Sequence, residues 1–217
     1  MITNLWPNLL FWSLYFIFIN NRYNSIISSN IVSLTHALLT IAGSSYIVYN
    51  LIYADTCNDT CNDTCNDSLS IKLINVSASY FIYDCLFMLL SKFSLMFFAH
   101  HLIILGVYYI ALTYDYGYKL VILSLFWGEI TNPLQITWFL SRMLNYKQLE
   151  HYIFPIFSFN FIIIRTLILP LIHYTMISSL FKTTDNYYPT IGLSILIILG
   201  TLGGMLWTKK MIKKIIK

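Results

Sequence analysis

Long apolar stretches separated by short polar segments make up most of the chain. We identify seven of them, over residues 5–19, 31–53, 71–90, 95–112, 119–140, 153–176 and 190–207. Most reach the roughly 20 residues that an α-helix needs to cross a hydrocarbon core about 30 Å thick. The pattern therefore predicts an all-α integral membrane protein, a bundle of about six or seven transmembrane helices. Because the first stretch is the shortest, six spans is the alternative count.

The composition supports the same class. Hydrophobic residues make up 58% of the 217 residues and charged residues only 10%, with a mean hydropathy of +0.68. A soluble domain carries about 25% charged residues, so a soluble fold of this size could not bury so much apolar surface. Five of the 13 Lys and Arg residues lie within 209–217. They form a basic tail beside a membrane helix rather than a nucleic-acid-binding surface.

The basic residues also predict the orientation in the membrane. Cytosolic loops carry an excess of Lys and Arg, so the tail over 209–217 places the C-terminus in the cytosol. Residues 1–22 are expected to form an extra transmembrane helix rather than a cleaved signal peptide, because no basic residue precedes their apolar core. Counting back through seven spans places two residues in the lumen, Lys119 and Lys182, and four in cytosolic loops: Arg22, Lys92, Arg142 and Lys147.

The loop predicted over residues 54–70 has low complexity, because the sequence TCND occurs there three times in tandem. The repeat creates three N-glycosylation sequons, predicted to be lumenal, at Asn58, Asn62 and Asn66. It also spaces three cysteines four residues apart, at Cys57, Cys61 and Cys65. These could be metal ligands, but zinc sites rarely show this spacing, so a repeat expansion in a solvated loop is the favoured interpretation. Cys85 lies within a predicted helix and is expected to serve packing.

Seven His, Asp, Glu or Arg residues lie within the predicted spans, where a charged group costs about 2.5–3.5 kcal/mol on insertion. They are His36, Asp84, His100, His101, Glu129, Arg165 and His173. A rise of about 1.5 Å per residue places His36, Asp84 and the His100–His101 pair at one level, on the order of 8–10 Å from the cytosolic ends of their helices. Glu129 and Arg165 fall nearer the midplane, and His173 is expected at the lumenal interface.

This set of residues has two interpretations. Two acids and one Arg leave one excess negative charge, which a protonated His or a protonated carboxyl would neutralise, and such groups carry out general acid–base chemistry. The alternative is a structural network that fixes helix register. Pro133 and Pro170 predict kinks beside Glu129 and Arg165, because proline cannot donate to the carbonyl four residues before it. No motif for a resident cofactor or a metal site stands out.

Together these residues and their spacing resemble the TLC domain, which translocon-associated membrane proteins, ceramide synthases and several small lipid-related proteins share. The resemblance runs from about residue 23 through 213 and is closest to the small TLC-domain-containing membrane proteins. It rests on LTHALL around His36, SYFIYD ending at Asp84, AHHLIILGVYYIAL around His100 and His101, GEITNPLQITWF around Glu129, and FIIIRTLILP around Arg165. The ceramide synthase motif is incomplete, because Ile104 stands where the synthases have Thr and the aspartates before Glu129 are missing.

The resemblance implies helices around a lipid-accessible cavity in the endoplasmic reticulum or a related endomembrane, and a function in lipid metabolism. In an acyltransferase using acyl-CoA as co-substrate, His100 or His101 would act as the base or carry the acyl group, Asp84 would orient it, and Arg165 would stabilise negative charge. The alternative is a non-catalytic protein that binds membrane lipids and regulates their composition. A transporter is less favoured, since the sequence shows no inverted repeat. A small-residue motif, Gly200 and Gly204, predicts a helix-packing face and a candidate oligomer contact.

Overall fold

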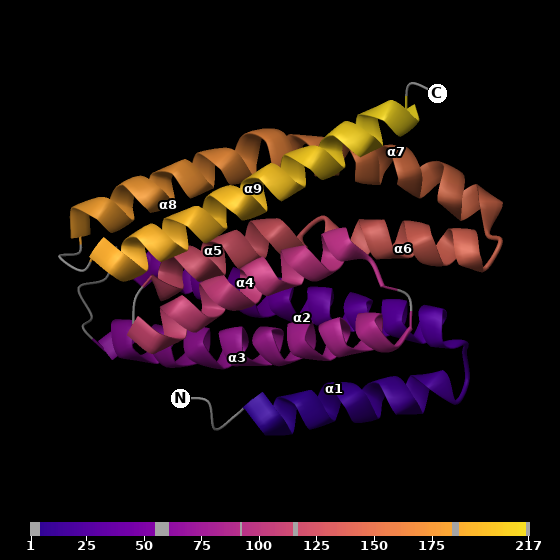
Figure 1. Cartoon of the computed structure of the whole chain (residues 1–217), viewed down its shortest axis with the longest axis horizontal. Helices are drawn as coiled ribbons and strands as arrows, with labels where there is room; N and C mark the ends of the chain where they lie inside the picture. The colour runs from indigo at the N-terminus through magenta and orange to yellow at the C-terminus, as the bar shows by residue number, and fades with distance from the viewer. Residues whose placement is uncertain (1–4, 55–60, 92, 115–116, 184–186, 216–217) are drawn as a thin grey trace.

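The computed structural model describes residues 5–54, 61–91, 93–114, 117–183 and 187–215, and within this part of the chain all regular structure is helical (Figure 1). The predicted all-α fold class is thereby confirmed. The helices are α1 (Leu5–Asn20), α2 (Ser25–Ala54), α3 (Cys61–Leu90), α4 (Leu95–Tyr114), α5 (Tyr118–Glu129), α6 (Asn132–Met143), α7 (Lys147–Ile163), the π-helical segment η2 (Ile164–Ile168), α8 (Leu169–Thr183) and α9 (Tyr187–Ile215).

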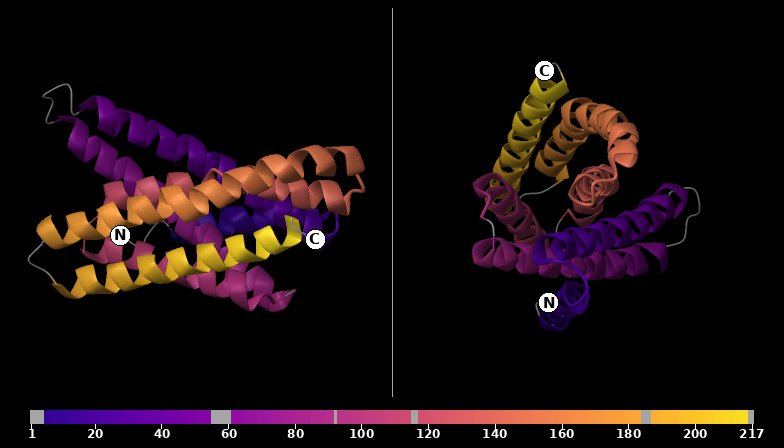
Figure 2. Two further views of the ribbon diagram at one scale, coloured as in Figure 1. Left: turned by 90° about the horizontal axis from the view of Figure 1, so that it is seen from above. Right: turned by 90° about the vertical axis from the view of Figure 1, so that its right-hand side faces the viewer.

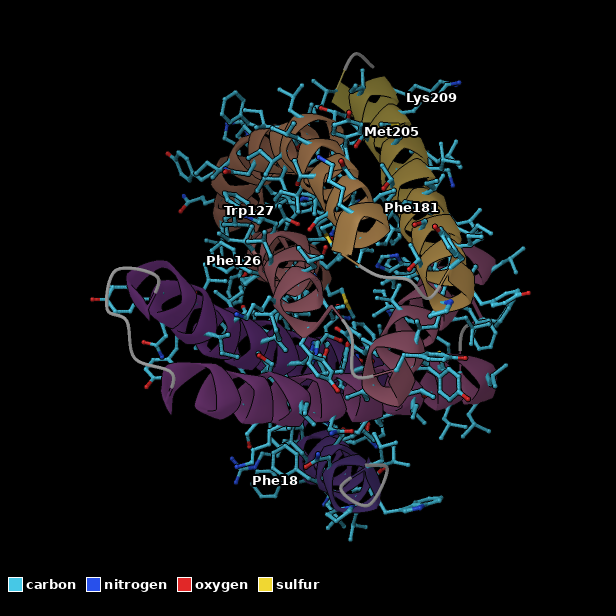
Figure 3. All side chains as sticks on the ribbon, turned by 90° about the vertical axis from the view of Figure 1, so that its left-hand side faces the viewer. Phe18, Phe126, Trp127, Phe181, Met205 and Lys209 are labelled. Atoms are coloured by element: carbon cyan, nitrogen blue, oxygen red, sulfur yellow. The ribbon has the colours of Figure 1, made fainter. Side chains whose placement is uncertain are left out.

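Each predicted stretch corresponds to a helix or to an interrupted pair of helices. Among the described residues, five helical units are long and apolar enough to cross a membrane: α2, α3, α4, the α7–α8 unit and α9. The helix α1 is apolar but shorter. The remaining stretch, predicted as one span over 119–140, is the pair α5 and α6. Large apolar side chains on the outer surface, such as Phe18, Phe181 and Met205 in Figure 3, are exposed, as lipid-facing residues are.

Six helical units form a closed ring. The units α2, α5–α6, α7–α8, α9, α4 and α3 follow one another, each packing on the next, and α3 packs back on α2. The end-on view in Figure 2 shows this arrangement. The helix α5 also contacts α3, α4 and α8, whereas α6 packs against α2 and α7. One half of the interrupted span therefore fills the centre of the ring, and the other half lies in its wall.

The helix α1 packs outside the ring, against α3 and α2. Its one buried residue is Trp12, whose Nε1 donates a hydrogen bond to the carbonyl of Val76, at 3.2 Å. Tyr15 forms a second link, through a 3.1 Å hydrogen bond between its hydroxyl and that of Thr35. The N-terminal helix therefore supports the ring from one side without contributing to its closure.

Two of the long helical units are interrupted where proline removes a backbone donor. The break between α5 and α6 follows Glu129 and precedes Pro133, as expected from the missing hydrogen bond. In the last but one unit, the π-helical segment η2 carries Arg165 and ends two residues before Pro170. Both predicted irregularities are present, and both fall beside a buried charged residue.

The ends of the bundle differ in charge. Because the helical units alternate in direction, the α1–α2 turn, the α6–α7 turn and the C-terminal end of α9 lie at one end of the bundle (Figure 1). These segments carry Arg22, Arg142, Lys147 and Lys209, so we call this end the basic end. There the α6–α7 turn passes through Asn145, whose φ of 59° lies in the left-handed region that Asn tolerates. An Arg142–Glu150 ion pair at 3.1 Å spans the same turn.

The structure describes only part of the TCND repeat. Residues 55–60, with Cys57 and Asn58, are outside the described part of the chain. The helix α3 begins at Cys61, so the second half of the predicted 54–70 loop is helical, although the side chains of Asn62, Asn66 and Cys65 are not described. Cys85 is a buried free thiol, in agreement with the packing role expected for it.

Candidate functional site

A cavity of ≈ 650 Å³ lies inside the ring, within the range of about 300–1,000 Å³ that is typical of small-molecule sites. It reaches the basic end at the exposed side chains of Ile26 and Phe93. The part of the cavity farthest from the basic end is called the inner end. Its lining includes the apolar residues Val121, Met176 and Leu196. All seven ionisable residues singled out from the sequence line this cavity: His36, Asp84, His100, His101, Glu129, Arg165 and His173.

His101 and Asp84 form the closest acid–base pair in the cavity. The Nδ1 of His101 lies 3.3 Å from Oδ2 of Asp84, and both side chains are largely buried. The angle between them is not that of a hydrogen bond, since Nδ1 makes none in the part of the chain described. A small rotation of the ring would align the pair, leaving Nε2 as the nitrogen available to a ligand. Neighbouring helices thus supply a histidine and a carboxylate that could orient it.

His36 is held by uncharged partners. Its Nε2 lies 3.0 Å from the hydroxyl of Ser77, which lies 3.1 Å from the hydroxyl of Tyr108. The imidazole stacks on Tyr80, with ring centroids 3.8 Å apart, and meets Trp12 of α1 edge-on at 5.8 Å. Side chains of α1, α3 and α4 therefore fix the position of this ring. We infer that His36 supports the wall of the cavity rather than acting on a ligand.

Glu129 lies at the break between α5 and α6. Its Oε2 accepts a 2.8 Å hydrogen bond from Nδ2 of Asn132 and lies 4.0 Å from Nδ1 of His36. The amide of Asn132 thus folds back over the break to hold the carboxyl group. The approach of Glu129 to His36 joins the interrupted span to α2, and both halves of that span, α5 and α6, pack against α2.

Among the described residues, no acid pairs directly with Arg165. Its Nη2 donates a 2.9 Å hydrogen bond to the carbonyl of Gly128, and its guanidinium lies over Phe161 at 5.4 Å from the ring centroid. The sequence led us to expect a carboxylate as the partner of Arg165. The carbonyl takes this place because the helix ends here and releases a backbone acceptor. Gly204 of α9 packs against this side chain and Gly200 against Ile103 of α4, so the small-residue face operates within the bundle.

The other two histidines lie on the wall formed by α4, α8 and α9. His100 packs edge-on against Trp207, with ring centroids 5.3 Å apart. His173 lines the cavity, and its Nδ1 lies 2.7 Å from the hydroxyl of Thr201. The expectation that His173 lies at the lumenal interface concerns its depth in the membrane and stays a prediction. Neighbouring residues on a helix point about 100° apart. His100 therefore points away from Asp84, the acid that His101 approaches.

Several residues of the site were not found from the sequence. Ser77, Tyr108, Asn132 and Trp207 position the charged groups, yet none of them is unusual in an apolar helix. Their helical spacing from the histidines and from Glu129 is the one signal in the sequence that could have singled them out. Among the described residues, no group of three His, Cys, Asp or Glu side chains has the arrangement to hold a metal ion.

The fold and the cavity define a multi-pass helical membrane protein with ionisable residues around an internal, partly apolar chamber. The TLC domain of the TRAM/LAG1/CLN8 family matches residues 26–213, from the first turn of α2 to near the end of α9. The chain therefore belongs to the TLC domain family, as the sequence predicted, and its function is lipid-related. The matched region includes the whole ring and excludes α1. No curated protein and no solved structure matched the chain.

Proposed function

We propose that the protein is an acyl-CoA-dependent lipid acyltransferase of the endoplasmic reticulum or a related endomembrane, with His101 as its general base. The observation that carries this proposal is the His101–Asp84 pair at 3.3 Å, largely buried in the wall of a cavity. A base oriented by a carboxylate is the usual means of activating a weak nucleophile. The cavity reaches the basic end, where a cytosolic acyl-CoA would enter, and its apolar inner end suits an acyl chain.

The proposed step is the transfer of an acyl group from sulfur to oxygen or nitrogen. His101 Nε2 takes the proton of the acceptor's hydroxyl or amine as that atom attacks the thioester carbonyl carbon. The new ester or amide bond forms, the carbon–sulfur bond breaks, and coenzyme A leaves as a thiolate that receives the proton from His101. Asp84 holds the imidazole and stabilises the charge that it carries between the two proton transfers.

The proposal is tested with purified protein in lipid nanodiscs, by following the loss of oleoyl-CoA with a panel of acceptors: a sphingoid amine, lysophospholipids and diacylglycerol. We expect His101→Ala to reduce turnover about 100-fold or more, as the removal of a general base usually does. The loss for His100→Ala should be smaller, because His100 packs on Trp207 and approaches no acid among the described residues.

His151→Ala is the matched control, because His151 is an exposed histidine at the start of α7 that does not line the cavity. It should leave turnover unchanged. Thermal unfolding of each variant would show whether a loss of turnover reflects a loss of structure. Wild-type turnover no higher than that of the His100→Ala/His101→Ala double variant, with every acceptor, would reject the proposed enzyme.

A non-catalytic lipid-binding protein is the second candidate. The observation that favours it is the misaligned His101 Nδ1, which makes no hydrogen bond in the described part of the chain and so lacks the orientation of a working base. In that case the ionisable residues would select a lipid instead of transforming it. Lipid extracted with the purified protein, in the absence of turnover with any acceptor, would support this candidate.

A further inference from the structure

The guanidinium of Arg165 is buried in the cavity wall with part of its hydrogen-bonding capacity unused. Only 9% of the residue is exposed. One nitrogen, Nη2, bonds the carbonyl of Gly128, while Nε is buried and has no hydrogen-bond partner in the described part of the chain. Guanidinium groups present several N–H donors in a fixed plane, and buried donors are normally satisfied. The geometry therefore leaves donors on a buried cation that lines an open chamber.

In the part of the chain that the structure describes, the charge of Arg165 is also not matched by a direct ion pair. No carboxylate of the described residues lies within 4 Å of it. Glu129 acts on Arg165 through space, but its Oε2 already accepts a hydrogen bond from Asn132. A buried charge without a contacting counter-ion is costly in an apolar environment. A bound anion would provide the missing partner.

The surroundings of Arg165 indicate what kind of anion would fit. His100 and His173 line the same cavity, so their ring N–H groups are further donors that an oxyanion in it could meet. On the side away from the basic end, the chamber continues into apolar residues, Val121, Met176 and Leu196. A small inorganic anion would leave this apolar volume empty, whereas an amphiphile would fill both parts.

We propose that Arg165 anchors the oxyanion group, carboxylate or phosphate, of an anionic lipid whose hydrocarbon chain occupies the inner end of the cavity. The inference deepens the proposed function by naming the class of lipid that the cavity binds. It concerns binding alone and requires no turnover. If the protein binds anionic lipids but transfers no acyl group, the inference holds and the proposed function fails. If it transfers acyl groups without preferring anionic lipids, the inference fails and the proposed function holds.

Equilibrium binding to the full-length wild type in nanodiscs of zwitterionic lipid gives the first test. Four radiolabelled probes are compared: oleate, 1-oleoyl lysophosphatidate, oleyl alcohol and inorganic phosphate. We expect at least one anionic lipid to bind about tenfold or more tightly than oleyl alcohol. Inorganic phosphate should bind more weakly than that anionic lipid and than oleyl alcohol. Preference for oleate would assign a carboxylate and preference for lysophosphatidate a phosphate. Equal binding of the alcohol and both anions would overturn the inference.

Variants at the same position give the second test. Arg165→Gln should remove the preference for the anion, and Arg165→Lys should retain part of it, because lysine keeps the charge but loses the planar set of donors. Arg142→Gln is the matched control, since Arg142 pairs with Glu150 outside the cavity and should not affect binding. If Arg165→Gln does not fold, Arg165→Lys and the wild-type comparison still decide the question. A folded Arg165→Gln variant with unchanged selectivity would overturn the inference.

Discussion

Uncharged side chains hold the ionisable residues of the cavity in place. Ser77 joins His36 to Tyr108, and Asn132 holds the carboxyl group of Glu129. Inside a membrane protein such contacts matter because the surrounding lipid offers no alternative partner. At the scale of the residue, the geometry of the site therefore depends on small polar groups as much as on the charged ones.

Replacing Ser77 with Ala should destabilise the protein more than replacing Tyr108 with Phe. The first change leaves both His36 and Tyr108 without their shared partner, whereas the second leaves Ser77 still bonded to His36. We expect a loss of about 1–2 kcal/mol for Ser77→Ala and less than 1 kcal/mol for Tyr108→Phe. Reversible unfolding in mixed micelles measures both values, and the opposite order would show that Tyr108 has a partner of its own.

The sequence revealed the charged residues of the site but not their partners. Asp84 and His101 could be placed at one depth because the helical rise is fixed and charges in apolar spans are rare. The carbonyl of Gly128 could not be predicted as the partner of Arg165, because the acceptor exists only where the helix ends.

At the scale of the element, the interruption of one span creates the chamber. Because the helix stops after Glu129, α5 can fill the centre of the ring while α6 lies against α2 and α7. An unbroken helix would continue along the line of α5 and occupy the space at the basic end. Pro133 predicted an irregularity here. The displacement of α6 results from its packing against α2 and α7, which the sequence pattern does not predict.

Among the residues of α1, Trp12 should contribute most to the stability of the ring. Trp12 is fully buried, and it contacts His36 and Tyr80 through its ring and Val76 through its Nε1. We expect Trp12→Ala to reduce the free energy of unfolding by about 3 kcal/mol, because it removes a large packed side chain. Trp6→Ala on the same helix is the control, since Trp6 is 75% exposed and should have little effect. Equal effects would show that α1 does not support the ring through Trp12.

At the scale of the whole molecule, the pattern of the sequence predicted the number of helical units and their alternating direction. It did not predict which unit lies outside the ring, because α1 is as apolar as the helices inside. The TLC domain match begins at residue 26, which agrees with a ring built from the later helices alone. An apolar composition shows that a helix contacts lipid. Whether the helix lies in the ring or outside it depends on how well its faces fit those of the neighbouring helices.

The distribution of basic residues predicts that the TCND repeat lies on the lumenal side. In a eukaryotic cell, one or more of Asn58, Asn62 and Asn66 should carry glycans, and glycosidase should increase the mobility of the protein on a gel. A variant with all three replaced by Gln is the control and should migrate like the deglycosylated protein. A protease-accessible tag that places this loop in the cytosol would contradict the orientation.

The interruption after Glu129 also affects how the chain enters the bilayer during synthesis. Each half of the pair has 12 residues, about 18 Å of helix, and is too short to cross alone. Together they bring Glu129, Asn132 and Pro133 to the middle of the would-be span, a position that insertion machinery strongly disfavours. An earlier segment, α2, contacts both halves and offers His36 to the carboxyl group. We therefore expect the α5–α6 segment to integrate late, after α2 is already in the membrane.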